Sequence, residues 1–136
     1  AMGLKDLCDL IHTAYHNDNL PRAQQEMYTT LPEMALRPAD AYDRLVKGRV
    51  ESVEIDDLMG RTLAVMIVPY PPGIPLIMPG ERITAATRSI QDYLIYARDF
   101  DRRFPGFETD IHGLRFEGAG DDRRYLVDCL TEGDGK

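Results

Sequence analysis

The sequence predicts a small mixed domain of the α+β class, and three observations lead to it. Apolar residues recur at spacings of three and four over about 4–17 and 85–103, which is the period of an amphipathic helix. Apolar and polar residues alternate around Val53 and again near the C-terminus, which is the period of a strand. Helices and strands do not alternate regularly as they do around a parallel sheet, so the mixed class is favoured.

Size and charge narrow the classes of protein. The chain has 136 residues and a formal net charge of −7, with 43% hydrophobic residues, which suits one globular domain. Its bases are scattered among acids, so no basic face for nucleic acid is expected. No stretch approaches the roughly 18 apolar residues of a membrane-spanning helix, so no membrane partner is expected. We expect a cloning remnant or linker at 1–3, a single domain over 4–130 and a frayed tail over 131–136.

The N-terminal part is predicted to be helical. The apolar stripe of the first helix, 4–17, consists of Leu4, Leu7, Leu10, Ile11 and Ala14. Cys8 on that stripe and Cys129 in a predicted strand are interpreted as buried small hydrophobes in a reducing compartment. A second helix begins at a proline and runs over 21–30, and Pro32 ends it. A third, 38–47, also begins at a proline, and Gly48 suits its C-cap.

The middle of the chain combines strands with an unusual proline segment. Alternation over 52–55 predicts a strand, and the continuous apolar run 65–68 predicts a strand buried on both faces. Five prolines fall within 69–79. Because each proline fixes φ and removes a backbone donor, neither a helix nor a central strand is predicted there. The large apolar residues between the prolines indicate an extended, rigid, packed loop.

One long amphipathic helix and a β-hairpin complete the expected domain. Thr84 is expected to cap a helix over about 85–103, and the Pro-Gly pair at 105–106 ends it. Its stripe consists of Ile90, Tyr93, Leu94, Ala97, Phe100 and Phe104. In the hairpin, alternation around Leu114 and Phe116 is followed by a turn at 118–122 and a second strand around Val127.

Two groups of polar residues are candidates for chemistry. Glu108, Asp110 and His112 would share one face if they lay in a strand. A carboxylate beside an imidazole tunes a general base or holds a metal, whereas the same cluster in a loop binds backbone amides or an arginine. Glu81 stands a few residues before the start of a predicted helix, where its negative charge would interact favourably with the helix dipole. Alternatively, it presents a carboxylate to a cationic substrate or a neighbouring subunit.

Other catalytic signatures are absent or weak. His12 and His16 have the spacing of two metal ligands on a helix, but the metalloprotease carboxylate after His12 is missing, so two surface histidines are favoured and no metal site is predicted. A small metal-dependent enzyme that also uses His112 stays an alternative. The sequence holds no nucleophile elbow, P-loop or dinucleotide fingerprint. None of its three lysines lies in an apolar stretch that would suit Schiff-base chemistry.

The proline segment carries a family resemblance. Residues 68–81 read Val-Pro-Tyr-Pro-Pro-Gly-Ile-Pro-Leu-Ile-Met-Pro-Gly-Glu and resemble a stretch in the C-terminal domain of the bacterial inducible-type ornithine/lysine/arginine decarboxylases. The Leu-Pro-Glu-Met of 31–34, the helix start at 38–42, the Met-Gly-Arg of 59–61 and residues 104–113 occur there in the same order and at similar spacing. The resemblance covers about 4–130.

The resemblance implies an enzyme larger than this chain. Such decarboxylases use pyridoxal phosphate (PLP) of fold type I to remove the α-carboxylate of a basic amino acid, and the cofactor supplies the electron sink. Their cofactor lysine lies in a Ser-x-His-Lys motif of the central domain, which is absent here. The resemblance therefore implies a C-terminal part with no catalytic residue and no bound cofactor. Its parent would be a cytoplasmic homo-oligomer, a dimer that assembles further into decamers.

Two roles follow from the resemblance. The docking loop against the PLP domain is expected to consist of Pro69, Tyr70, Pro71, Pro72, Gly73, Ile74 and Pro75, since a pre-ordered segment loses little entropy on docking. The active-site entrance is expected to include Glu81, Glu108, Asp110 and His112, which would concentrate a cationic amino acid. Lysine is favoured as substrate, with arginine and ornithine open. The alternative is a free-standing ligand-binding or interaction domain without catalysis.

Overall fold

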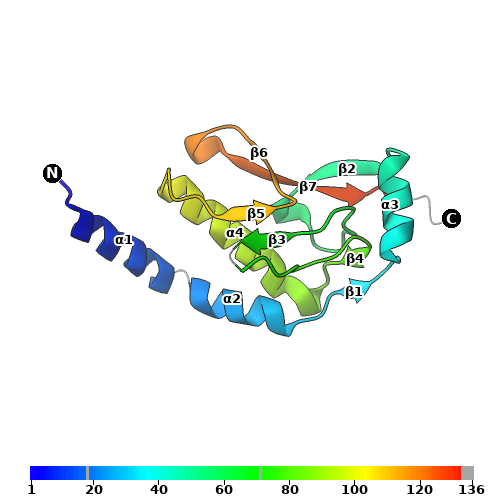
Figure 1. Ribbon diagram of the computed structural model, residues 1–136, viewed down its shortest axis with the longest axis horizontal. Coiled ribbons are helices and arrows are strands. Elements are labelled where there is room, and N and C mark those ends of the chain that lie inside the picture. The colour runs from blue at the N-terminus through cyan, green and yellow to red at the C-terminus, as the bar shows by residue number, and fades with distance from the viewer. Residues whose placement is uncertain (18, 71, 133–136) are drawn as a thin grey trace.

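The computed structural model describes residues 1–17, 19–70 and 72–132, and their architecture is α+β, as predicted (Figure 1). The helices are α1 (Leu4–Asn17), α2 (Leu20–Thr29), α3 (Pro38–Val46) and α4 (Arg88–Arg103). The strands are β1 (Glu33–Met34), β2 (Val50–Glu54), β3 (Val68–Tyr70), β4 (Glu81–Arg82), β5 (Asp110–His112), β6 (Arg115–Glu117) and β7 (Arg124–Leu130). Three 3₁₀ turns are η1 (Ile55–Asp57), η2 (Ala85–Thr87) and η3 (Gly120–Asp122).

The strands form three small antiparallel sheets. One has the order β2-β7-β6, and the other two are the pairs β1-β4 and β3-β5. In the predicted C-terminal hairpin, Phe116 of β6 lies opposite Tyr125 of β7. Figure 1 shows α4 running along the strands, with α2 beside it and α1 extending away from the body.

The main core consists of buried residues from α2, α4, β2 and β7, together with Leu63, Ile77 and Ile83 from the segments between the strands. All six residues of the predicted α4 stripe are buried, which confirms the helical period. Thr84 and Thr87 form the capping box of η2, which runs directly into α4, so the predicted cap serves this 3₁₀ turn and the α-helix itself begins three residues later, at Arg88. Cys129 is buried in β7, and this burial raises the pKa of its thiol to about 12.

The predicted apolar stripe of α1 is covered only in part: Ala14 and Ile11 pack on the body, whereas Leu4 and Leu10 are exposed. Ala14 is buried against Phe100 and Phe104, but Leu4 is 78% exposed. Cys8 is exposed rather than buried. The cause is tertiary, because α1 meets the body only through its last turns and the rest of its apolar face has nothing to cover it among the described residues (Figure 1).

The predicted strand at 65–68 is also wrong. β3 begins at Val68 and includes Pro69, while Met66 is exposed. A proline is tolerated because β3 lies in a two-stranded sheet, where one edge of the strand needs no donor. The strand predicted over 52–55 ends one residue early, because Ile55 begins η1.

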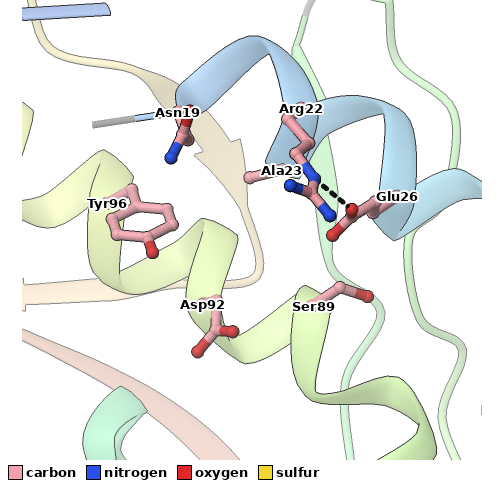
Figure 2. Close-up of a pocket in the computed structure, with 7 residues that line it drawn as sticks. All are labelled: Asn19, Arg22, Ala23, Glu26, Ser89, Asp92 and Tyr96. Atoms are coloured by element: carbon pink, nitrogen blue, oxygen red, sulfur yellow. Dashed lines mark hydrogen bonds and ion pairs between the residues drawn. The ribbon is translucent and has the colours of Figure 1, made fainter. Parts of the chain in front are cut away.

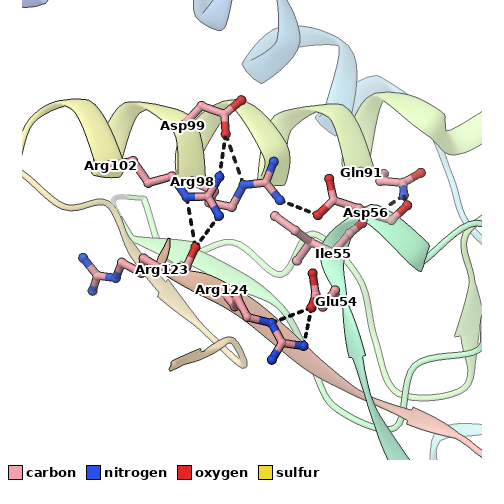
Figure 3. A network of polar contacts seen from close by, with 9 residues as sticks. All are labelled: Glu54, Ile55, Asp56, Gln91, Arg98, Asp99, Arg102, Arg123 and Arg124. Atoms are coloured by element: carbon pink, nitrogen blue, oxygen red, sulfur yellow. Dashed lines mark hydrogen bonds and ion pairs between the residues drawn. The ribbon is translucent and has the colours of Figure 1, made fainter. Parts of the chain in front are cut away.

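The side chains of α4 also hold neighbouring segments by polar contacts (Figure 3). Gln91 is buried and donates from Nε2 to the carbonyl oxygens of Ile55, at 2.9 Å, and Asp56, at 2.8 Å. Arg102 donates from Nε to the carbonyl oxygen of Arg123 at 3.0 Å. These bonds fix η1 and the start of β7 against α4.

No helix in the described part of the chain is both long enough and apolar enough to cross a bilayer. Thr131 still donates its backbone N–H to the carbonyl oxygen of Arg49, at 3.2 Å. Most of the expected frayed tail, residues 133–136, lies outside the described residues, as does Pro71 of the expected docking loop.

Candidate functional site

The small sheet β3-β5 brings the proline segment and the candidate polar cluster together. Tyr70 lies opposite Asp110 in this sheet, and Val68 lies opposite His112. Asp110 and His112 share one face, and their side chains approach to 3.4 Å between Oδ1 and Nε2. Both side chains are largely exposed, so an imidazole and a carboxylate lie in contact on the surface.

Tyr70 connects this pair to the proline segment. Its ring meets the His112 ring edge to face, with 6.3 Å between the centroids. The backbone N–H of Gly73 donates to the carbonyl of Pro69 at 3.0 Å and closes the turn. Gly73 has φ +82°, and a Cβ there would press on the Tyr70 ring at 3.0 Å. Glycine therefore lets the turn fold back onto this ring.

The proline segment is only partly packed. Leu76 and Ile77 are buried in the core, and Pro69 is buried in β3. Tyr70 is 58% exposed and Ile74 is 53% exposed. The expected packed loop is therefore packed at one end only, and its exposed apolar tip also includes Pro72 and Pro75.

Glu108 lies apart from the Asp110–His112 pair. It precedes β5, and its Oε1 accepts a hydrogen bond from Nη1 of Arg123 at 3.3 Å. The pKa of Glu108 is lowered chiefly by hydrogen bonds from the backbone at Gly106 and at Glu108 itself, with a further contribution from Arg123. This is the loop-anchoring interpretation that the sequence left open.

Glu81 also lies elsewhere. It belongs to β4, opposite Met34, and its Oε2 accepts a hydrogen bond from the backbone N–H of Met78 at 2.7 Å. The interpretation that Glu81 complements a helix dipole is wrong, because the chain forms β4 at this point and the carboxylate closes a turn. Glu81 and the Asp110–His112 pair therefore lie in different sheets.

Asp101 is the polar residue that sequence reasoning missed. It is 2% exposed, and its Oδ1 accepts hydrogen bonds from the N–H and the hydroxyl of Thr109, each at 2.8 Å. Its Oδ2 accepts a hydrogen bond from the Tyr125 hydroxyl. Burial, together with this carboxylate, raises the pKa of Tyr125 well above its usual range. A signal was present, because Asp101 follows Leu94 and Ala97 at the helical spacing of the stripe.

In the described part of the chain, hollows lie beside α4 and beside the proline segment. One of them, with a volume of about 190 Å³, lies between α2 and α4. Figure 2 shows the residues that line it: Asn19, Arg22, Ala23, Glu26, Ser89, Asp92 and Tyr96. A second, of about 300 Å³, lies between α2, Tyr93 and the prolines at 69 and 72. A third, of about 230 Å³, includes Asp101, Glu108 and Arg123. In the first hollow, Arg22 Nε lies 2.6 Å from Glu26 Oε1, so these two charged side chains of the lining already pair with each other.

Metal-ligating residues do not converge in the part of the chain that the structure describes, where no group of three or more His, Cys, Asp or Glu side chains is placed to hold an ion. His12 and His16 lie on exposed turns of α1, with 4.9 Å between their ring centroids. His112 lies in β5 and contacts Tyr70 and Asp110 instead.

Comparisons with known proteins agree on one family. Residues 21–131 match the family model described as "Orn/Lys/Arg decarboxylase, C-terminal domain". The chain is 56% identical over 131 residues to lysine decarboxylase LdcA of Pseudomonas aeruginosa, which covers 96% of this chain and 17% of that relative. It is 42% identical over 119 residues to the constitutive lysine decarboxylase of Escherichia coli, covering 88% of this chain and 17% of that relative.

A solved structure shows the same fold. The structure of lysine decarboxylase A from Pseudomonas aeruginosa superposes with a TM-score of 0.87 at 56% identity, over 95% of this chain and 17% of that chain. The chain thus spans about a sixth of the length of the proteins it matches.

Proposed function

Because this chain belongs to the family of Orn/Lys/Arg decarboxylase C-terminal domains, we propose that it is the C-terminal domain of a PLP-dependent decarboxylase of lysine. The observation that carries the proposal is the similarity to lysine decarboxylases over nearly the whole chain, in sequence and in fold. It favours this function over a free-standing binding domain. Arginine and ornithine decarboxylases belong to the same described family, so the choice of lysine rests on the closer relatives.

The chemistry of the reaction would be carried by another part of the parent enzyme. PLP would supply the electron sink that decarboxylation needs, and a lysine of the parent enzyme would hold it. The two lysines in the described residues do not fit this task, because Lys5 and Lys47 are exposed and Lys47 forms an ion pair with Asp43 at 2.6 Å. This chain would therefore contribute binding surfaces rather than the catalytic centre.

Exposed apolar residues support docking on the PLP domain. The tip of the proline loop presents Tyr70 and Ile74. The free stripe of α1 adds Leu4 and Leu10. Exposed apolar side chains that lie together in one patch are typical of a surface that another protein surface covers. The homo-oligomeric state and the cytoplasmic location that the family resemblance implies belong to the same proposal.

The Asp110–His112 pair is the strongest candidate for the entrance. It lies in contact with Tyr70, so it adjoins the proposed docking loop. A carboxylate there would raise the local concentration of a cationic amino acid. Glu81 and Glu108 are weaker candidates, because one closes the turn at Met78 and the other pairs with Arg123.

The test is kinetic and uses the full-length enzyme. Asp110→Asn removes the charge at nearly constant shape and should raise KM for lysine by about two- to fivefold, with kcat within about twofold. Asp121→Asn is the matched control, since Asp121 is an exposed carboxylate in the turn between β6 and β7. Equal KM values in the two variants would contradict the entrance role.

A further inference from the structure

Asp101 is a buried carboxylate without an ion-pair partner among the described residues. It projects from α4 and is almost fully enclosed. Burying a charge is costly unless hydrogen bonds compensate for the lost water. Both oxygens of Asp101 do accept hydrogen bonds, and all three donors come from only two residues, Thr109 and Tyr125.

The position of Thr109 gives these bonds a consequence beyond stability. Thr109 directly precedes β5, which carries Asp110 and His112. β5 is three residues long and pairs with β3, which is equally short. Two bonds from Thr109 to one oxygen of Asp101 tie the start of β5 to α4, and Tyr125 ties the other oxygen to β7. Hydrogen bonds to a charged acceptor are about twice as strong as neutral ones, so this is a firm anchor.

We propose that Asp101 is a positioning residue that fixes the Asp110–His112 segment through Thr109. The value of this position to the enzyme rests on the proposed entrance role of that segment. The fixed start of β5 holds Asp110 opposite Tyr70 and keeps its carboxylate in contact with His112. Without the anchor, β5 would depend on its three-residue pairing and on the buried Ile111.

Three variants of the full-length enzyme separate the anchor from the entrance. Asp101→Asn replaces one of the two carboxylate oxygens with an NH₂ group. The hydrogen bonds from Thr109 and Tyr125, which two oxygens accept in the parent, would then have a single acceptor oxygen. Thr109→Val removes the hydroxyl donor but leaves Asp101 and Tyr125 in place, so it carries the test if Asp101→Asn fails to fold. Thr109→Ser keeps the hydroxyl and is the matched control.

Hydrogen exchange of residues 107–112, measured by mass spectrometry, is the direct readout. Loss of a bond to a charged acceptor should speed exchange there by about threefold or more in Asp101→Asn and Thr109→Val, with Thr109→Ser close to the parent. Exchange in residues 90–97 of α4 should not change. Unchanged exchange of residues 107–112 in both variants would overturn the inference.

Kinetics on the same variants report on the proposed function separately. Faster exchange with a raised KM for lysine, an unchanged kcat and recovery in Thr109→Ser would support both the anchor and the entrance. Faster exchange with an unchanged KM would support the anchor and contradict the entrance role.

Discussion

Gly113 lies so close to Met66 that no side chain fits between them. Gly113 has φ +96°, and a Cβ on it would overlap the carbonyl oxygen of Met66. This close approach brings the end of β5 against the segment that leads into β3. A glycine is needed here for two reasons, the backbone conformation and the space.

Gly113→Ala is therefore expected to destabilise the protein by about 2 kcal/mol or more, from the positive φ and the overlap together. Gly48→Ala is the matched control, because Gly48 also has a positive φ of +70° but no atom lies within 4 Å of the place that its Cβ would take. The control should cost about 1–2 kcal/mol. Urea unfolding followed by circular dichroism measures both, and equal losses would contradict the role of the close approach.

Gln91 should be costly to replace because it is the donor for two carbonyls of η1. Gln91→Met leaves the Ile55 carbonyl without this donor in a buried place, which should cost about 1–3 kcal/mol. Gln25→Met changes an exposed position of α2 in the same way and should fall within about 0.5 kcal/mol of the parent. Thermal unfolding compares the two, and similar midpoints would rule out this bond as a stabilising contact.

The two cysteines should differ sharply in reactivity. Cys8 is exposed, whereas burial raises the pKa of Cys129 to about 12, so its reactive thiolate is scarce and enclosed. An aromatic disulfide reagent at pH 8 should modify one thiol quickly in the folded protein and the second only after unfolding. Cys8→Ser should abolish the fast phase and Cys129→Ser should leave it intact. A fast phase that survives Cys8→Ser would contradict the burial of Cys129.

The carboxyl of Glu108 should titrate below its usual range. Its pKa is lowered in the folded state, so its contribution to stability is present above the unfolded pKa of about 4.5 and is lost as the pH falls through the folded value. Glu108→Gln should therefore lower the melting temperature at pH 7 and make no difference at a pH below the folded pKa. If the melting temperatures of Glu108→Gln and the parent differed by the same amount at every pH, the lowered pKa of Glu108 would not be the cause of the difference.

Glu81→Gln separates charge from structure at the second candidate. The glutamine oxygen can still accept the bond from Met78, so the turn and the stability should be retained. If Glu81 helps to attract the cationic substrate, KM in the full-length enzyme should rise by about two- to threefold, and the rise should shrink in high salt. A KM equal to that of the parent would restrict the entrance to the Asp110–His112 pair.

The elements with a strong local pattern were predictable. The stripe of α4, the prolines in the first turns of α2 and α3 and the pairing of the C-terminal hairpin are confirmed. The alternation predicted for the hairpin is not, because all three residues of β6 are exposed and β7 buries Tyr125, Leu126 and Val127 in succession. The strand at 65–68 was mispredicted, because an apolar run does not show whether its backbone finds a partner strand. The contact between Asp110 and His112 followed from the alternation of side chains along a strand. Glu108 does not share their face, because it lies before β5 begins.

The α+β class, the family and most helix boundaries could be read from the chain alone, because these depend on periods and motifs within short windows. Which apolar faces are covered depends on the folded arrangement, which leaves much of the α1 stripe and the tip of the proline loop in solvent. The same holds for the partner of each carboxylate: Met78 for Glu81, Arg123 for Glu108, and Thr109 with Tyr125 for Asp101. Burial and hydrogen bonding join residues that are distant in the chain, and no local pattern encodes those distances.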